Sequence, residues 1–506
     1  MIWEALTKLA LLGTERGQLP AEVKSALEQV GVDTSAAPEQ QLLDAAALYH
    51  QLRRAGFPLL KAPEQTFEAP EASPRKLPPA RAARQLQHIV QGRYRGALTE
   101  FLSLLEQGEW KVPPEQLPTL FTYAVKQPLF WRKLRPLIGS RGQWLLRQNP
   151  DWHPLAEQPP AEDWHGQDTG QQLMMLRYLR RREPEQALPP LRAVWPNQNY
   201  ADKKRLLEEL QEGLSEKDLP FLEEARKDRR KEVRQTATHL LLFIPSSTVQ
   251  QELSANAQQL LSMDSKGQLQ VDYPTSLTQE LKRLGIGKRN KSVYSGGQAA
   301  NWTYEILSKV PPKHWESHFK RPTLDCMRLF LRGNRQRLLT DAVANAALLH
   351  QDHRWVEAIL RHWWRTGQEK QWSNALGNML IEALPAGAFN DMLEAQFRQD
   401  SGYVAENSLA AQMLCLGVHD WSVSVSKKVI LGLQERLNGS SAYHWDLWHY
   451  KRILKIAAFR VAPSLLSDLR LGWDKRTPVW ERWAPDIDRF LKTLAFRADM
   501  YKNLKQ

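Results

Sequence analysis

The chain has 506 residues, of which 42% are hydrophobic and 25% charged, and its formal net charge is +13. This composition is typical of a folded globular protein and excludes a wholly disordered or a collagen-like chain. Its two cysteines exclude a disulfide framework and a cysteine-rich zinc site. No apolar run approaches the roughly 20 residues of a membrane-spanning helix, and no basic region precedes the apolar N-terminal stretch as in a secretory signal. We therefore expect a cytoplasmic protein without a membrane segment.

Hydrophobic periodicity predicts an all-α protein. Apolar residues recur at helical spacing in four well-marked stretches, over 42–52, 233–244, 356–363 and 487–494. Each stretch gives one apolar stripe, so each helix needs a neighbouring helix to cover it. The 19 tryptophans are expected mostly as wedges between such helices, because each ring buries a large apolar area.

Proline and glycine divide the chain into six expected segments. They are N-terminal helices (1–60), a Pro-rich connection (61–79), a helical segment with a corner motif (80–160), HEAT-like helical pairs (161–262), a hairpin with a basic Gly-rich loop (263–297) and C-terminal helical repeats (298–506).

An internal repeat marks the HEAT-like segment. The sequence Leu-Pro-Pro-Leu at 188–191 recurs as Leu-Pro-Phe-Leu at 219–222, and each copy begins a short helix that a longer helical pattern follows. Two antiparallel helices per 30–45 residues are the unit of an α-solenoid, and the second copy resembles a HEAT repeat. In that copy we expect Asp218 to cap the first helix and Asp228 the second. The predicted fold is therefore α-solenoid-like, with stacked helical pairs.

One segment departs from the helical pattern. Leu269, Val271 and Tyr273 alternate with polar residues, which predicts a short hairpin or extended insert. The residues that follow, 285–298, are polar, basic and rich in glycine, and are expected to form a loop.

The positive charge is unevenly distributed. Residues 246–340 carry 14 basic and 7 acidic residues, whereas residues 161–245 carry 15 of each. The densest basic run consists of Lys282, Arg283, Lys288, Arg289 and Lys291. Such a run either solvates a helix surface or attracts a polyanion such as nucleic acid.

A second candidate interaction site lies at residues 139–152. Gly139 is expected to end one helix and Arg141-Gly142 to begin the next, which Asn149-Pro150 stops because the residue before proline disfavours helical geometry. Two tryptophans flank this corner, so it is either a rigid packed element or a site for a ligand or partner. Its candidate residues are Arg141, Trp144, Asn149 and Trp152.

No catalytic or cofactor motif was identified. The Gly-x-Gly-Lys at 285–288 lacks the other residues of a phosphate-binding loop. The two histidines at 314 and 318 lack the glutamate that directly follows the first histidine in zinc proteases, and no third ligand is recognisable. We therefore expect no catalytic, cofactor or metal site.

Four short landmarks carry a resemblance to a known family. They occur in order at 10–16 (ALLGTER), 112–118 (VPPEQLP), 139–152 and 488–500. The chain resembles a bacterial family of unknown function whose members are typically encoded beside a SWIM zinc-finger protein, a MoxR-type AAA ATPase and a protein with a von Willebrand factor A (VWA) domain. The resemblance implies a helical protein that works with the ATPase and the VWA partner. It implies no reaction and brings no catalytic residues.

Three function classes follow from these observations. The leading hypothesis is a non-enzymatic helical-repeat scaffold or adaptor for protein–protein interaction. The alternative is a helical-repeat protein that binds nucleic acid through a basic face. An enzyme whose site is assembled from distant helices would leave no local motif and is the third class.

Overall fold

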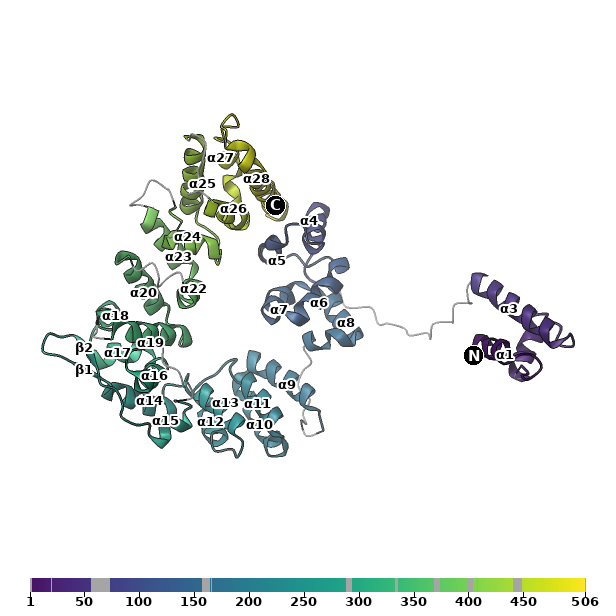
Figure 1. The fold of residues 1–506 in the computed structure, drawn as a ribbon, viewed down its shortest axis with the longest axis horizontal. Helices are drawn as coiled ribbons and strands as arrows, with labels where there is room; N and C mark the ends of the chain where they lie inside the picture. Colours follow the sequence, from purple (N-terminus) through teal and green to yellow (C-terminus); the bar gives the residue numbers. More distant parts are fainter. Residues whose placement is uncertain are drawn as a thin grey trace. The chain divides into compact units, whose positions relative to one another are not determined.

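The computed structural model shows a predominantly helical protein in two compact units, Met1–Glu71 and Ala72–Gln506 (Figure 1). It describes residues 2–19, 21–55, 73–156, 164, 166–287, 294–332, 335–367, 374–397, 404–406, 408–439 and 448–505. Within these residues the only strands form one short hairpin, so the prediction of an all-α protein is confirmed. None of the described helices combines the length and the apolar character needed to span a bilayer.

The described part of the first unit contains three helices. They are α1 (Ile2–Leu12), α2 (Ala21–Gln29) and α3 (Pro38–Ala55). Helix α1 packs against α3, and a small apolar core including Leu6, Leu9, Leu27 and Ala45 lies between the helices. The predicted periodic stretch at 42–52 lies within α3.

The second unit begins with a block of short helices joined by tight turns. They are α4 (Ala80–Val90), α5 (Leu98–Gln107), α6 (Leu117–Lys126), α7 (Pro128–Leu134) and α8 (Gly139–Gln148). Their shared core is built on the buried Phe101, Phe121 and Trp131. Of the predicted connection 61–79, only residues 73–79 are described, and there Lys76 forms an isolated bridge with Trp110.

Six α-helices follow in the described residues of the predicted HEAT-like segment. They are α9 (Thr169–Arg182), α10 (Leu188–Val194), α11 (Tyr200–Glu209), α12 (Leu219–Ala225), α13 (Lys231–Leu241) and α14 (Thr248–Gln259). Both copies of the repeat therefore contain the two helices predicted for them. Helix α11 packs against α9 and α13, the helices two places before and after it, and α13 also packs against its direct neighbours α12 and α14.

The predicted caps of the second copy differ from the structure. Asp218 makes no capping bond to α12, because its carboxylate accepts the backbone N–H of Ser215 and pairs with Arg180. Asp228 accepts the backbone N–H of Arg230 at 2.8 Å, one residue before α13 begins, and its other oxygen pairs with Lys203. Both carboxylates bind cations from the preceding helices, and local capping alone does not describe their roles.

The predicted hairpin is present. Strand β1 (Leu261–Met263) pairs antiparallel with β2 (Leu269–Val271), so the first strand lies ahead of the segment where the alternation was recognised. Tyr273 lies beyond β2 and donates its hydroxyl to the carbonyl oxygen of Ser295.

The remainder of the unit is helical. Its helices are α15 (Gln279–Arg283), α16 (Gly297–Leu307), α17 (Pro312–Phe319), α18 (Thr323–Arg332), α19 (Gln336–Leu349), α20 (His353–Arg365), α22 (Ala375–Glu382), α23 (Ala386–Phe397), α24 (Leu409–Leu416), α25 (Val423–Asn438), α26 (Trp448–Arg460), α27 (Leu466–Arg470) and α28 (Trp480–Leu504). The stretches 356–363 and 487–494 lie within α20 and α28, as predicted. Trp315, Trp355 and Trp363 are fully buried, which confirms the expected wedge role for these three rings.

The two ends of the second unit meet. The long C-terminal helix α28 packs against α26 and also against α4 and α5. The side chains of Met500 and Leu504 complete the core of the α4–α8 block. The last helix therefore contributes to the core of the first helices of the unit.

Candidate functional site

The corner at residues 139–152 contains a short helix that begins at a glycine with positive φ and ends at an extended asparagine. Helix α8 begins at Gly139, two residues before the predicted start at Arg141-Gly142. Gly139 has a φ of +61°, which glycine adopts without steric cost, and a Cβ there would lie 2.9 Å from the hydroxyl oxygen of Ser73. Asn149 is extended, which ends the helix as predicted, and its side chain accepts the backbone N–H of Asp151.

The four candidate residues of the corner have different environments. Trp152 is half-buried and packs edge-on against Phe121, with 5.3 Å between ring centroids. Trp144 is half-buried, and Arg141 is exposed. Asn149 is a local cap, so Trp152 and Asn149 have structural surroundings that account for them.

The basic run is only partly described. Lys288, Arg289 and Lys291 lie outside the described residues, whereas Lys282 and Arg283 are exposed on α15. These two side chains line a cavity of about 820 Å³ that α12 and α13 also border. We call this the basic cavity, and its lining residues are Glu223, Arg226, Lys227, Lys231, Arg234, Gln235, Thr238, Lys282 and Arg283.

Helical spacing explains why α13 faces this cavity with polar side chains. Arg234, Gln235 and Thr238 follow Lys231 by three, four and seven residues. This spacing places all four side chains on one face of the helix. The opposite face carries the apolar residues, including Val233, that pack into the core. One amphipathic helix thus has a buried apolar face and a cationic face in the cavity.

Glu223 is the one acidic residue among these lining residues, and it has other partners. Its carboxylate accepts the hydroxyl and the backbone N–H of Thr248 and lies 3.7 Å from the guanidinium of Arg226. Arg226 also binds Glu252 at 3.2 Å. Among the described side chains, the carboxylate of Glu223 forms no ion pair with the lysines of the cavity.

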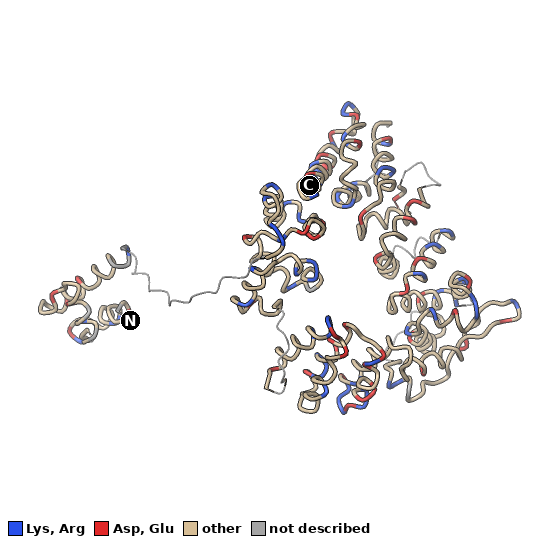
Figure 2. Tube along the Cα trace, turned by 180° about the vertical axis from the view of Figure 1, so that it is seen from behind, with Lys and Arg blue, Asp and Glu red and all other residues tan. Residues whose placement is uncertain are grey.

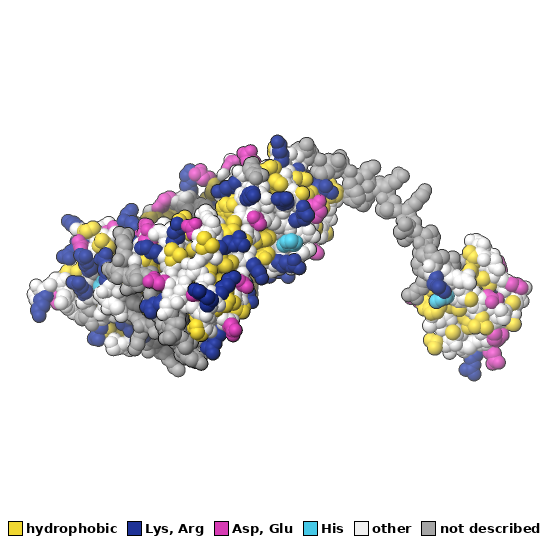
Figure 3. Space-filling view, turned by 90° about the horizontal axis from the view of Figure 1, so that it is seen from above, with side chains coloured by type: hydrophobic (Ala, Val, Ile, Leu, Met, Phe, Trp, Pro, Cys, Tyr) yellow, Lys and Arg dark blue, Asp and Glu magenta, His cyan; other side chains and the backbone are white. Residues whose placement is uncertain are grey.

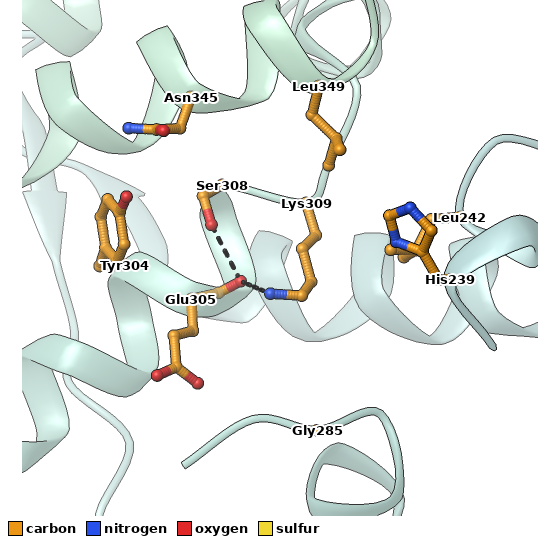
Figure 4. Close-up of a pocket in the computed structure, with 9 residues that line it drawn as sticks. All are labelled: His239, Leu242, Gly285, Tyr304, Glu305, Ser308, Lys309, Asn345 and Leu349. Carbon is orange, nitrogen blue, oxygen red and sulfur yellow. Dashed lines mark hydrogen bonds between the residues drawn. The ribbon is translucent and has the colours of Figure 1, made fainter. Parts of the chain in front are cut away.

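The chain just after α15 is held by a buried glutamate, Glu305, which lines a second cavity of about 390 Å³ (Figure 4). The carboxylate of Glu305 on α16 accepts the backbone N–H of Gly287 at 2.7 Å, which anchors the chain just after α15. The ammonium group of Lys309 reaches the backbone carbonyl oxygen of Glu305 instead of its carboxylate. His239 of α13 lines the same cavity, and loss of water contact together with the charge of Lys309 lowers its pKa.

The remaining titratable candidates are two histidines and the two cysteines. His314 and His318 stack with 6.2 Å between ring centroids, and no group of three metal-ligating side chains was found in the described part. Burial, followed by the charge of Glu316, raises the pKa of Cys326 to about 11, so its thiol is protonated at neutral pH. Burial also raises the pKa of Cys415.

Two buried ion pairs were not anticipated from the sequence. Arg180 and Asp218 have side chains only 1% exposed and lie 2.8 Å apart, although 38 residues separate them. Arg497, within the landmark at 488–500, binds both carboxylate oxygens of Glu100 from 397 residues away. An arginine on the apolar face of a predicted helix is a weak sequence signal of a buried ion pair. Its acidic partner, however, is set only by the tertiary fold.

Comparisons with known proteins agree with an uncharacterised family. A search of curated proteins and a search of solved structures each found no significant match to the chain. One family model, described as "Family of unknown function (DUF5691)", matches residues 5–504. Because this match spans nearly the whole sequence, the chain belongs to the DUF5691 family of unknown function.

Proposed function

We propose that this protein is a non-enzymatic helical-repeat scaffold or adaptor for protein–protein interaction. The observation that carries the proposal is the succession of contacts from α9 through α11, α13, α14 and α16 to α19, in which each helix packs on the next. Helices stacked in this α-solenoid-like manner give a long surface in proportion to their core, and such surfaces bind proteins or peptides.

Exposed apolar side chains support a role in binding proteins. In the second unit Leu129 of α7 is 76% exposed and Leu471, after α27, is 73% exposed. Figure 3 shows hydrophobic side chains among Lys and Arg side chains on one face of the molecule. Large apolar residues at the centre of an interface, surrounded by polar groups, are typical of binding surfaces.

The resemblance described above suggests the partners. We propose that the chain binds a MoxR-type AAA ATPase, a VWA-domain protein, or both. The direct test mixes the full purified chain with each candidate from the same organism and measures the mass of the eluting species. A stable complex supports the proposal, whereas monomeric elution with every candidate, and no partner recovered from native lysate, contradicts it.

A matched pair of variants on α7 adds a surface test. Leu129→Asp removes an exposed apolar side chain, and Lys133→Asp places the same residue one turn further along the helix at an exposed cation. If the α7 surface takes part in binding, Leu129→Asp should weaken the complex by about tenfold or more and Lys133→Asp by less.

Nucleic-acid binding through a basic face stays a prediction. Figure 2 shows Lys and Arg interspersed with Asp and Glu along the helices, and three of the five residues of the basic run lie outside the described part. Steep loss of DNA or RNA affinity between about 50 and 200 mM salt would support this alternative.

A further inference from the structure

We propose that the basic cavity is a binding site for a compact ligand that carries several phosphate groups. This inference goes beyond the scaffold role and does not depend on it. It rests on six Lys and Arg side chains that converge on one cavity from α12–α13 and from α15, which lie about 50 residues apart in the sequence.

Four of these cations have no acidic partner among the described residues. The side chains of Lys227, Lys231, Lys282 and Arg283 form no ion pair or hydrogen bond with the described residues. Helices α9 and α11 differ, because there Arg177 pairs with Glu209, and other cations of these helices also bind carboxylates. Like charges gathered around one cavity repel each other, and a bound polyanion would relieve that repulsion.

The two remaining arginines are held in place by the protein itself. Arg234 donates to the backbone carbonyl oxygens of Asp228 and Arg229 at 2.9 and 2.8 Å. Arg226 is fixed by the hydroxyl of Thr248 and by the carboxylates of Glu252 and Glu223, which offset its charge, so it frames the cavity. Guanidinium groups positioned before binding lose less conformational entropy when an anion arrives, and their fork geometry suits phosphate oxygens.

The size and lining of the cavity favour a small ligand over nucleic acid. A volume of about 820 Å³ is within the range of small-molecule sites. The described lining residues include no aromatic ring, so among them a single-stranded nucleic acid would find no base-stacking platform. Phosphate groups carry more charge per atom than carboxylates and match a site whose lining is mainly Lys and Arg.

Calorimetric titration of the full chain with inorganic tripolyphosphate tests the proposal. We expect saturable binding and a rise of the melting temperature, because a ligand that binds only the folded state stabilises it. The double variant Lys231→Glu/Lys282→Glu should lose affinity by about tenfold or more, since it reverses two charges that face the cavity. The control Lys126→Glu/Lys133→Glu makes the same change in net charge on exposed lysines of α6 and α7 and should bind like the parent.

Parallel titrations distinguish the source of the phosphates. Binding of ATP at the strength of tripolyphosphate would indicate a free small molecule, and tighter binding of a multiply phosphorylated peptide would indicate a modified protein segment. Both outcomes support a site for clustered phosphates. No saturable binding of tripolyphosphate, equal losses in the two double variants, equal binding of an unphosphorylated Glu-rich peptide, or tighter binding of a DNA or RNA oligonucleotide would overturn the proposal.

Discussion

Replacing Arg180 by methionine should lower the free energy of unfolding far more than replacing an arginine on a helix surface. The guanidinium donates to five acceptors: both carboxylate oxygens of Asp218 and the backbone carbonyl oxygens of Pro184, Leu210 and Glu212, at 2.7–3.1 Å. Methionine fills much of the same volume but satisfies none of these acceptors. It leaves the Asp218 carboxylate as an uncompensated charge that is 1% exposed.

The magnitude follows from the burial of the pair. Removing one partner of a buried ion pair costs about 3–5 kcal/mol, because the remaining charge stays desolvated. The matched control is Arg177→Met, one turn earlier on α9. Arg177 pairs with Glu209 but its side chain is 45% exposed, so its loss should cost about 1 kcal/mol or less.

Urea and thermal unfolding of the full chain, followed by circular dichroism, measure both variants. Large chains often unfold in more than one step. The quantity to compare is therefore the midpoint of the transition in which the α9–α13 helices unfold. The double variant Arg180→Met/Asp218→Leu should cost less than the sum of the two single changes, because no buried charge remains. Equal stability of Arg180→Met and Arg177→Met, or strict additivity in the double variant, would refute the reasoning.

Three further predictions concern the corner, the histidines and the thiols. In thermal melts, Trp144→Ala and Trp152→Ala should each lower the free energy of unfolding by about 1.5–3 kcal/mol, because both rings are half-buried. Arg141→Ala, at an exposed position, should change it by no more than about 0.5 kcal/mol. If both Trp variants melt like the parent but lose partner binding, the corner is an interaction site. Stability should fall as the pH is lowered from about 7.5 to 5.5, because the unfolded chain, with histidine pKa values near 6.5, then binds more protons than the folded chain; an unchanged melting temperature over this range would contradict it. The histidines whose pKa is lowered, chiefly by desolvation, are His239, His314, His350 and His362. Cys326, buried and with a pKa raised to about 11, should resist iodoacetamide at pH 8 in the folded chain and react after unfolding, as mass spectrometry would show.

The sequence alone predicted the local elements because their signals are local. Apolar residues at helical spacing located the helical stretches, including 487–494 on α28 and most of 233–244, since α13 ends at Leu241, three residues before the end of that stretch. Proline restricts the residue that precedes it, so Asn149-Pro150 predicted the end of α8. The alternation at 269–273 predicted the hairpin, although its first strand was not recognised.

The tertiary structure alone decided which distant charges meet. Asp218 has the sequence features of a helix cap, yet Arg180, 38 residues away, binds its carboxylate. Residues 161–245 contain equal numbers of acidic and basic residues, so counting charge by segment predicts no cationic site there. The fold directs several carboxylates to partners elsewhere and leaves Lys231 and its neighbours facing Lys282 across a cavity. Helical periodicity states which face of a helix is polar, but the element opposite that face depends on packing between distant segments, which no local pattern encodes.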